Sequence, residues 1–148
     1  MDVVWYVRYR REGGKDRFAD WELSTGTEDF ESAGTPAKVG WRLVEEVVHV
    51  ELPDSTAAVT NSVVHWATGS QWGAGYGLAT ALGLRPGLRS GVLLGLAACS
   101  TSYVVLPRLG LYKPIWEYDA KTLARDYSAH LVFGVVTAAV VWGLSRPW

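Results

Sequence analysis

Three long stretches without a charged residue lie in the second half of the chain. They run from Ser55 to Leu84 (30 residues), from Ser90 to Pro107 (18 residues) and from Tyr127 to Ser145 (19 residues). A helix that crosses a bilayer needs about 20 mostly apolar residues. A soluble protein can bury one such helix in its core, but three in succession with charges only at the breaks predict a membrane protein. We therefore expect an all-α integral membrane helical bundle with transmembrane helices over about 57–83, 90–107 and 127–145.

The charged residues divide the chain in the same way. All 15 Asp and Glu residues lie between Asp2 and Asp54 or between Glu117 and Asp126. The net charge of −1 provides no basic surface for nucleic acid, so we expect no nucleic-acid partner and take the lipid bilayer as the main one. Cys99 is the only cysteine, which excludes a disulfide within the chain.

The basic residues predict the orientation. Eleven of the 14 Lys and Arg residues fall on the side of the N-terminal segment and of the connector around Lys113. The opposite side has Arg85, Arg89 and Arg146, and Trp142 and Trp148 are placed to mark that interface. Because cytoplasmic loops carry the excess of basic residues, we expect a multi-pass protein of the cell (inner) membrane with a cytoplasmic N-terminal segment.

Residues 1–54 form the predicted surface segment. Val3–Val7 followed by Arg8, Arg10 and Arg11 resembles the end of a membrane span and its basic stop. We therefore expect the reading frame upstream to encode about 15 further apolar residues, which would give a fourth span. Glu12–Pro36 is polar and rich in turn residues, which predicts an irregular loop over the membrane surface.

An amphipathic helix is predicted over about 36–51. Val39, Leu43, Val47 and Val50 recur there at helical spacing among charged residues. The pattern fits a helix that lies in the membrane interface and equally one that packs on the protein's own cytoplasmic loops.

Small residues repeat every fourth position in all three predicted spans, which places them on one face of each helix. Such faces let the backbones of membrane helices approach closely, so we expect them to form the helix contacts. The residues concerned are Gly69, Gly73, Gly77, Gly91, Gly95, Gly134 and Ala138.

His65 and His130 begin two of these faces and form the candidate polar site within the membrane. Asn61 lies one turn before His65, and Gln71 follows it closely. A polar side chain at this depth must find a partner, because lipid offers none. The histidines can serve as hydrogen-bonding contacts between helices, as a proton- or solute-handling pair, or as ligands of a haem iron.

No catalytic or metal-binding pattern is present. Zinc needs three or four ligands, and only His49 with Glu45 or Glu46 could join the two histidines, so we predict no metal and no cofactor. Ser100–Ser102 has no base beside it, which argues against an enzyme. Two functions remain open: a non-enzymatic scaffold or accessory protein, which docks a partner through exposed Trp21, Phe30 and Trp41, and a small oligomeric transporter or proton-handling protein that uses His65 and His130.

Three segments carry a resemblance to known proteins: VRYRREGGKDRFADWELSTGTEDFE, NSVVHWATGSQWGAGYGL and SYVVLPRLGLYKPIWEYDAKTLARDYSAHLVFG. They resemble a family of small, uncharacterised actinobacterial membrane proteins and, more distantly, the YagU-like inner-membrane proteins. The resemblance implies the membrane architecture and a further Gly/Ala-rich helix before the YRREGG stretch. It implies no activity.

Overall fold

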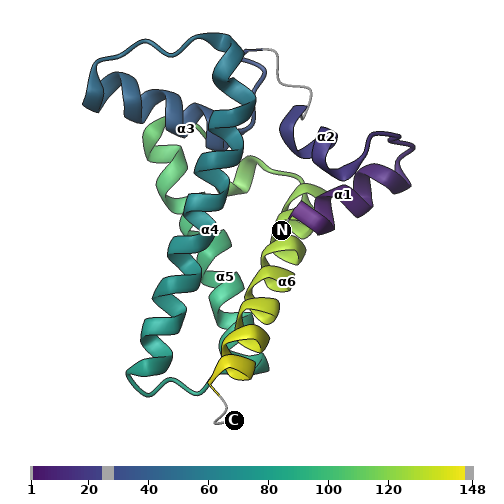
Figure 1. Cartoon of the computed structure of the whole chain (residues 1–148), viewed down its shortest axis with the longest axis vertical. Helices are drawn as coiled ribbons and strands as arrows, with labels where there is room; N and C mark the ends of the chain where they lie inside the picture. Colours follow the sequence, from purple (N-terminus) through teal and green to yellow (C-terminus); the bar gives the residue numbers. More distant parts are fainter. Residues whose placement is uncertain (1, 25–28, 146–148) are drawn as a thin grey trace. The chain divides into compact units, whose positions relative to one another are not determined.

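The computed structural model describes residues 2–24 and 29–145, and every regular element in these ranges is helical. The predicted all-α class is therefore confirmed. The main helices are α1 (Asp2–Arg11), α2 (Phe18–Ser24), α3 (Thr35–Leu43), α4 (Ala57–Ala81), α5 (Leu88–Val105) and α6 (Ala120–Leu144) (Figure 1). Arg146 and Trp148, which were used to predict the orientation of the chain in the membrane, lie outside the described residues.

The chain forms two compact units. The first contains Asp2 and Tyr6–Ser70, and the second contains Val3–Trp5 and Gln71–Trp148. The N-terminal half of α4 thus belongs to the first unit and its C-terminal half to the second.

In the first unit, α1 and α2 are held together by aromatic side chains. The ring of Tyr6 lies 5.2 Å from that of Phe18 and 5.5 Å from that of Trp21. The predicted irregular loop over Glu12–Pro36 is wrong at α2, because Phe18 and Trp21 lie one turn apart and together reach Tyr6. The prediction treated Trp21 as an isolated, exposed anchor, whereas it is half-buried in this cluster.

The predicted amphipathic helix begins with α3 and continues as a π-helical turn over Val44–Val48. It ends at His49, whose φ of 58° lies in the left-handed region and reverses the chain. Gly40 packs against α4, where a Cβ added to it would lie 2.5 Å from Cγ2 of Thr60 and 2.8 Å from Cγ2 of Val64.

A small apolar core lies beneath α3, and it corrects a second prediction. Phe30 is only 6% exposed and packs with Ala33, Ala37 and Ala57. Trp41 stacks on Phe30 with ring centroids 6.0 Å apart. Two of the three aromatics expected as exposed docking anchors thus pack in the protein's own core or against it.

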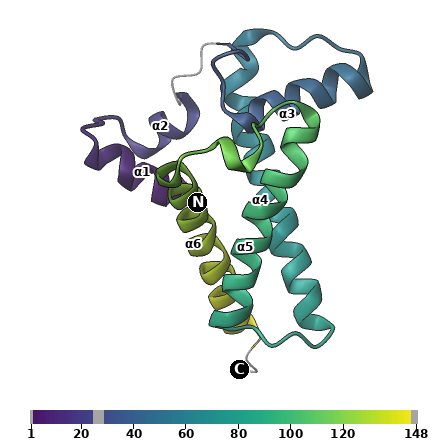
Figure 2. The ribbon, with the colours of Figure 1, turned by 180° about the vertical axis from the view of Figure 1, so that it is seen from behind.

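In the second unit, α5 and α6 lie side by side and run antiparallel (Figures 1 and 2). Among the described residues, two helical segments are long and apolar enough to cross a membrane: Leu88–Leu109, which is α5 with its 3-10 extension, and α6. The prediction counted three. α4 has the length, but Asn61, His65, Gln71 and several hydroxyl side chains make it too polar to meet the same standard.

The boundaries of the long helices follow the predicted breaks, with one exception. α6 begins at Ala120 rather than at Tyr127, because Asp119 caps it. The Asp119 carboxylate accepts a hydrogen bond of 2.9 Å from the backbone N–H of Thr122 and one of 2.7 Å from its hydroxyl. From this cap the helix runs through Lys121 and Arg125 without interruption.

Candidate functional site

His65 contacts a carboxylate within the first unit. Its Nε2 lies 2.8 Å from Oδ1 of Asp2, with the two side chains 25% and 17% exposed. Asp2 begins α1 and His65 lies in α4, so the pair ties these two helices together. His65 was predicted as a polar residue of the candidate site, but its partner was not, because nothing in the sequence brings residue 2 near residue 65.

Asn61 lies one turn before His65 and packs against Gly34. A Cβ added to Gly34 would lie 2.8 Å from Oδ1 of Asn61. This oxygen is buried and accepts no hydrogen bond from the described part of the chain. Asn61 therefore contributes close packing beside α3, and its carbonyl does not reach His65.

His130 lies in the second unit, so neither unit contains both histidines. Its Nδ1 lies 2.9 Å from the backbone carbonyl oxygen of Asp126, one turn earlier in α6. One ring nitrogen is thereby satisfied within its own helix, which is how a histidine serves as a structural group.

A polar cluster that was not predicted from the sequence joins α5 to α6. The buried Tyr103 donates a hydrogen bond of 2.5 Å to Oδ2 of Asp126. Beside it, the hydroxyls of Ser100 and Tyr127 lie 3.1 Å apart. Asp126 ends the second charged block of the sequence, and in the structure it lies within α6 and is half-buried.

Three further aromatic rings surround Tyr103. Those of Tyr118 and Tyr112 lie 5.2 Å and 5.4 Å away, and that of Tyr127 is parallel to it at 6.2 Å. The four tyrosines come from α5, α6 and the connector between them, so the cluster closes this end of the helix pair. Aromatic and charged residues alternate over Tyr112–Tyr118 in the sequence, but this pattern does not show which of the rings contact Tyr103.

The small residues of α5 and α6 meet where the two helices pack. A Cβ on Gly91 would lie 2.8 Å from the carbonyl oxygen of Gly134 and 2.9 Å from Cβ of Ala138. A Cβ on Gly95 would clash with the backbone of His130, and one on Gly134 would clash with the backbone of Gly91. The structure thus brings four of the predicted packing residues into one contact at backbone distance.

The glycines of α4 behave differently. A Cβ added to Gly73 or Gly77 would meet no described atom within 4 Å. Gly69 lies in the first unit and is half-buried. The α4 face that was predicted to pack in the bundle is therefore open at its C-terminal half.

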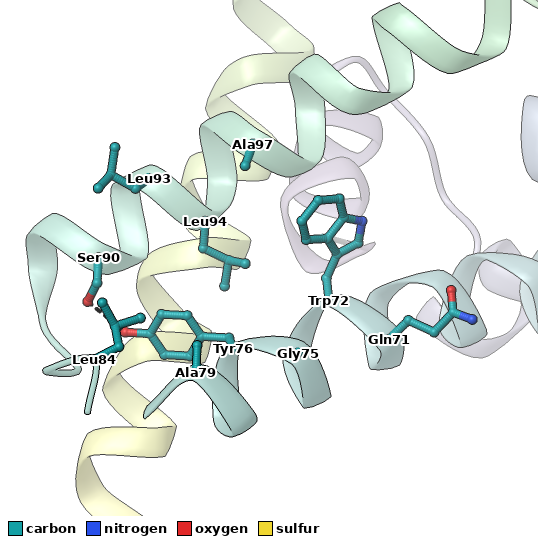
Figure 3. Close-up of a pocket in the computed structure, with 10 residues that line it drawn as sticks. All are labelled: Gln71, Trp72, Gly75, Tyr76, Ala79, Leu84, Ser90, Leu93, Leu94 and Ala97. Carbon is teal, nitrogen blue, oxygen red and sulfur yellow. Dashed lines mark hydrogen bonds between the residues drawn. The ribbon is translucent and has the colours of Figure 1, made fainter. Parts of the chain in front are cut away.

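A groove of about 660 Å³ lies between this half of α4 and α5. Trp72 and Tyr76 extend from α4 toward α5 and leave Gly75 between them (Figure 3). The α5 side consists of Leu93, Leu94 and Ala97. A hydrogen bond of 2.7 Å between the hydroxyls of Tyr76 and Ser90 joins the two walls at one end. Gln71 also lines the groove, which makes it the only predicted polar-site residue there.

In the ranges 2–24 and 29–145 no group of three His, Cys, Asp or Glu side chains is arranged to hold a metal ion. His49 is exposed at the end of the π-helical turn, and Glu45 and Glu46 lie in that turn. No family model, curated protein or solved structure matches the chain.

Proposed function

We propose that the chain is a non-enzymatic integral membrane protein, a scaffold or accessory protein that crosses the bilayer three times. One observation carries the membrane assignment. In the α5–α6 pair the small residues face inward, and large apolar side chains such as Leu93, Val132 and Val136 are exposed. Only 28% of the α5 span and 17% of the α6 span is buried, so neither resembles the core helix of a soluble protein.

α4 is proposed as the third span. Its 25 residues at about 1.5 Å each exceed the roughly 30 Å of a hydrocarbon core. It has no Asp, Glu, Lys or Arg side chain. Two of its hydroxyls are satisfied locally: Thr68 donates to the carbonyl of Val64 at 2.8 Å, and Thr80 to that of Tyr76 at 3.0 Å. Such bonds lower the cost of placing a polar helix in lipid.

The helix over α3 and the π-helical turn is proposed to lie at the membrane surface. Its inner side packs on the first unit through Ala37 and Gly40, whereas Leu43, Val47 and Val48 are exposed. An exposed apolar edge beside charged residues suits the headgroup region. The excess of basic residues outside the spans favours the cytoplasmic side of the inner membrane for this segment.

The topology is tested with single cysteines in a Cys99→Ala background, labelled in intact cells by a membrane-impermeant maleimide. Three spans place Glu51→Cys and Glu117→Cys on one side and Leu82→Cys on the other. If α4 does not span, Leu82→Cys labels with Glu51→Cys and opposite to Glu117→Cys. Release of the chain from membranes by alkaline carbonate would contradict the membrane assignment itself.

The local partners of both histidines favour the scaffold over a transporter. His130 is bonded within its own helix, His65 is paired with Asp2, and neither lines the groove. In proteoliposomes we expect proton flux to be equal for the parent, His65→Ala and His130→Ala and no greater than in protein-free vesicles. A flux that the parent shows and either variant loses would favour the proton-handling function.

A further inference from the structure

The groove between α4 and α5 has the shape and lining of a site for a hydrocarbon chain. Its volume of about 660 Å³ falls within the range of about 300–1,000 Å³ that is typical of ligand pockets. Its walls are mainly apolar, and its hydroxyls, those of Tyr76 and Ser90, are bonded to each other. A polar solute would therefore find few free hydrogen-bonding groups, whereas an alkyl chain needs none.

The groove stays open because α4 places small residues along it. Gly75 lines the groove directly, and a Cβ there would meet no described atom within 4 Å. Trp72 and Tyr76, one turn apart, supply aromatic walls on either side of this gap (Figure 3). In the bilayer proposed above, an open apolar groove between two membrane spans is accessible to lipid chains.

Two arginines lie at the end of the groove where the helices are joined. Leu84 and Ser90 line that end, and Arg85 and Arg89 are their neighbours in the chain. Both arginines are exposed, and no acidic residue occurs between Asp54 and Glu117 to neutralise them. Guanidinium groups bind phosphate through paired hydrogen bonds, and basic residues at a membrane surface attract anionic lipids.

We propose that the α4–α5 groove binds an anionic phospholipid, with one acyl chain between Trp72 and Tyr76 and the phosphate on Arg85 and Arg89. The positive charge of Arg85 and Arg89 selects an anionic headgroup, and the groove binds the acyl chain of the lipid. This inference rests on the proposed membrane location.

The test measures retention of phosphatidylglycerol and phosphatidylcholine by the purified full chain, using native mass spectrometry from nanodiscs that contain both lipids. We expect the parent to prefer phosphatidylglycerol by about thirtyfold, because two basic residues contribute at the surface. Arg85→Gln/Arg89→Gln should abolish this preference. Arg108→Gln/Lys113→Gln removes the same charge away from the groove and should leave the preference intact.

Variants that fill the groove distinguish lipid binding at this site from a general attraction of anionic lipids to the basic residues. Gly75→Leu should reduce retention of both lipids at least tenfold, and Ala97→Phe provides a second filling variant from the α5 side. Gly143→Leu is the matched control, because a side chain there meets open space in α6. Circular dichroism checks that each variant is folded.

Two results would overturn the proposal. One is equal retention of the two lipids by the parent, and the other is retention that the arginine and filling variants do not change. If Gly75→Leu disrupts a dimer and leaves lipid retention unchanged, a second copy of the chain occupies the groove instead. A chain that enters nanodiscs without preferring phosphatidylglycerol refutes the lipid site alone, whereas one that fails to enter them refutes the membrane location.

Discussion

Tyr103 donates a hydrogen bond of 2.5 Å to Asp126, and this bond joins α5 to α6 through a carboxyl group within a predominantly apolar helix. Tyr103 also contacts three other tyrosine rings, so one residue combines the polar and the aromatic contacts at this end of the helix pair.

We expect Tyr103→Phe to destabilise the protein by about 1–3 kcal/mol, because the Asp126 carboxylate loses its donor while it stays half-buried. The free energy of unfolding can be measured by titration of detergent micelles with dodecyl sulfate. Tyr127→Phe is the matched control, since it removes a hydroxyl paired only with Ser100 and should cost about 0.5–1.5 kcal/mol. If both variants lower the free energy of unfolding by the same amount, the hydrogen bond to the Asp126 carboxylate stabilises the protein no more than the bond between Ser100 and Tyr127.

The glycines at the α5–α6 contact should tolerate no added side chain. Gly134→Ala and Gly95→Ala should each cost about 1–3 kcal/mol, because the new Cβ meets backbone atoms that cannot move independently. Gly143→Ala, in open space on α6, should be neutral or stabilising by up to about 1 kcal/mol. The same unfolding titration measures all three, and a stable Gly134→Ala protein would contradict the backbone contact.

The Asp2–His65 pair should show energetic coupling. A double-mutant cycle with Asp2→Asn and His65→Ala should give a coupling of about 0.5–3 kcal/mol, as expected for residues in direct contact. A parallel cycle with Asp2→Asn and His130→Ala serves as the control, because His130 bonds within its own helix. No coupling in the first cycle would mean that the pair does not hold α1 on α4.

The cap of α6 predicts an acid-dependent loss of stability. Hydrogen bonds from the side chain and backbone of Thr122 hold the pKa of Asp119 below its ordinary value. The carboxylate therefore stabilises the fold above about pH 4, and the contribution disappears as the pH falls through the lowered pKa. Asp119→Asn keeps a capping group that does not titrate, so the difference in melting temperature between parent and variant should change only below about pH 4.

The features of this fold that depend on the boundaries between charged and uncharged stretches could be predicted from the sequence. α4 begins just after Asp54 and ends just before Arg85, and α5 ends just before Pro107. A charge or a proline at each of these positions makes a longer span unfavourable, and such residues are visible directly in the sequence. The third span was predicted to begin at Tyr127 because the uncharged stretch begins there. α6 starts seven residues earlier and includes Lys121 and Arg125, whose long side chains can reach the interface from a helix end.

The contacts that depend on distant residues were not predictable in the same way. Phe30 was expected on the surface, since its burial requires α3 and Ala57 to close over it. The partners of His65 and Tyr103 lie 63 and 23 residues away, at spacings that no helical period links. Four of the small residues were assigned to helix packing and meet in the structure, but nothing in their spacing indicated that Gly73 and Gly77 would stay open.

Cys99 continues the row of Gly91 and Gly95 on the buried face of α5, and none of its surface is exposed. As the only cysteine of the chain, it is a reporter that needs no engineering. A small thiol reagent can reach it only when α5 and α6 move apart. The rate of alkylation in the native protein therefore measures how frequently these helices separate. The close backbone contact that leaves no room for a methyl group on Gly95 thus also determines how often α5 and α6 separate transiently.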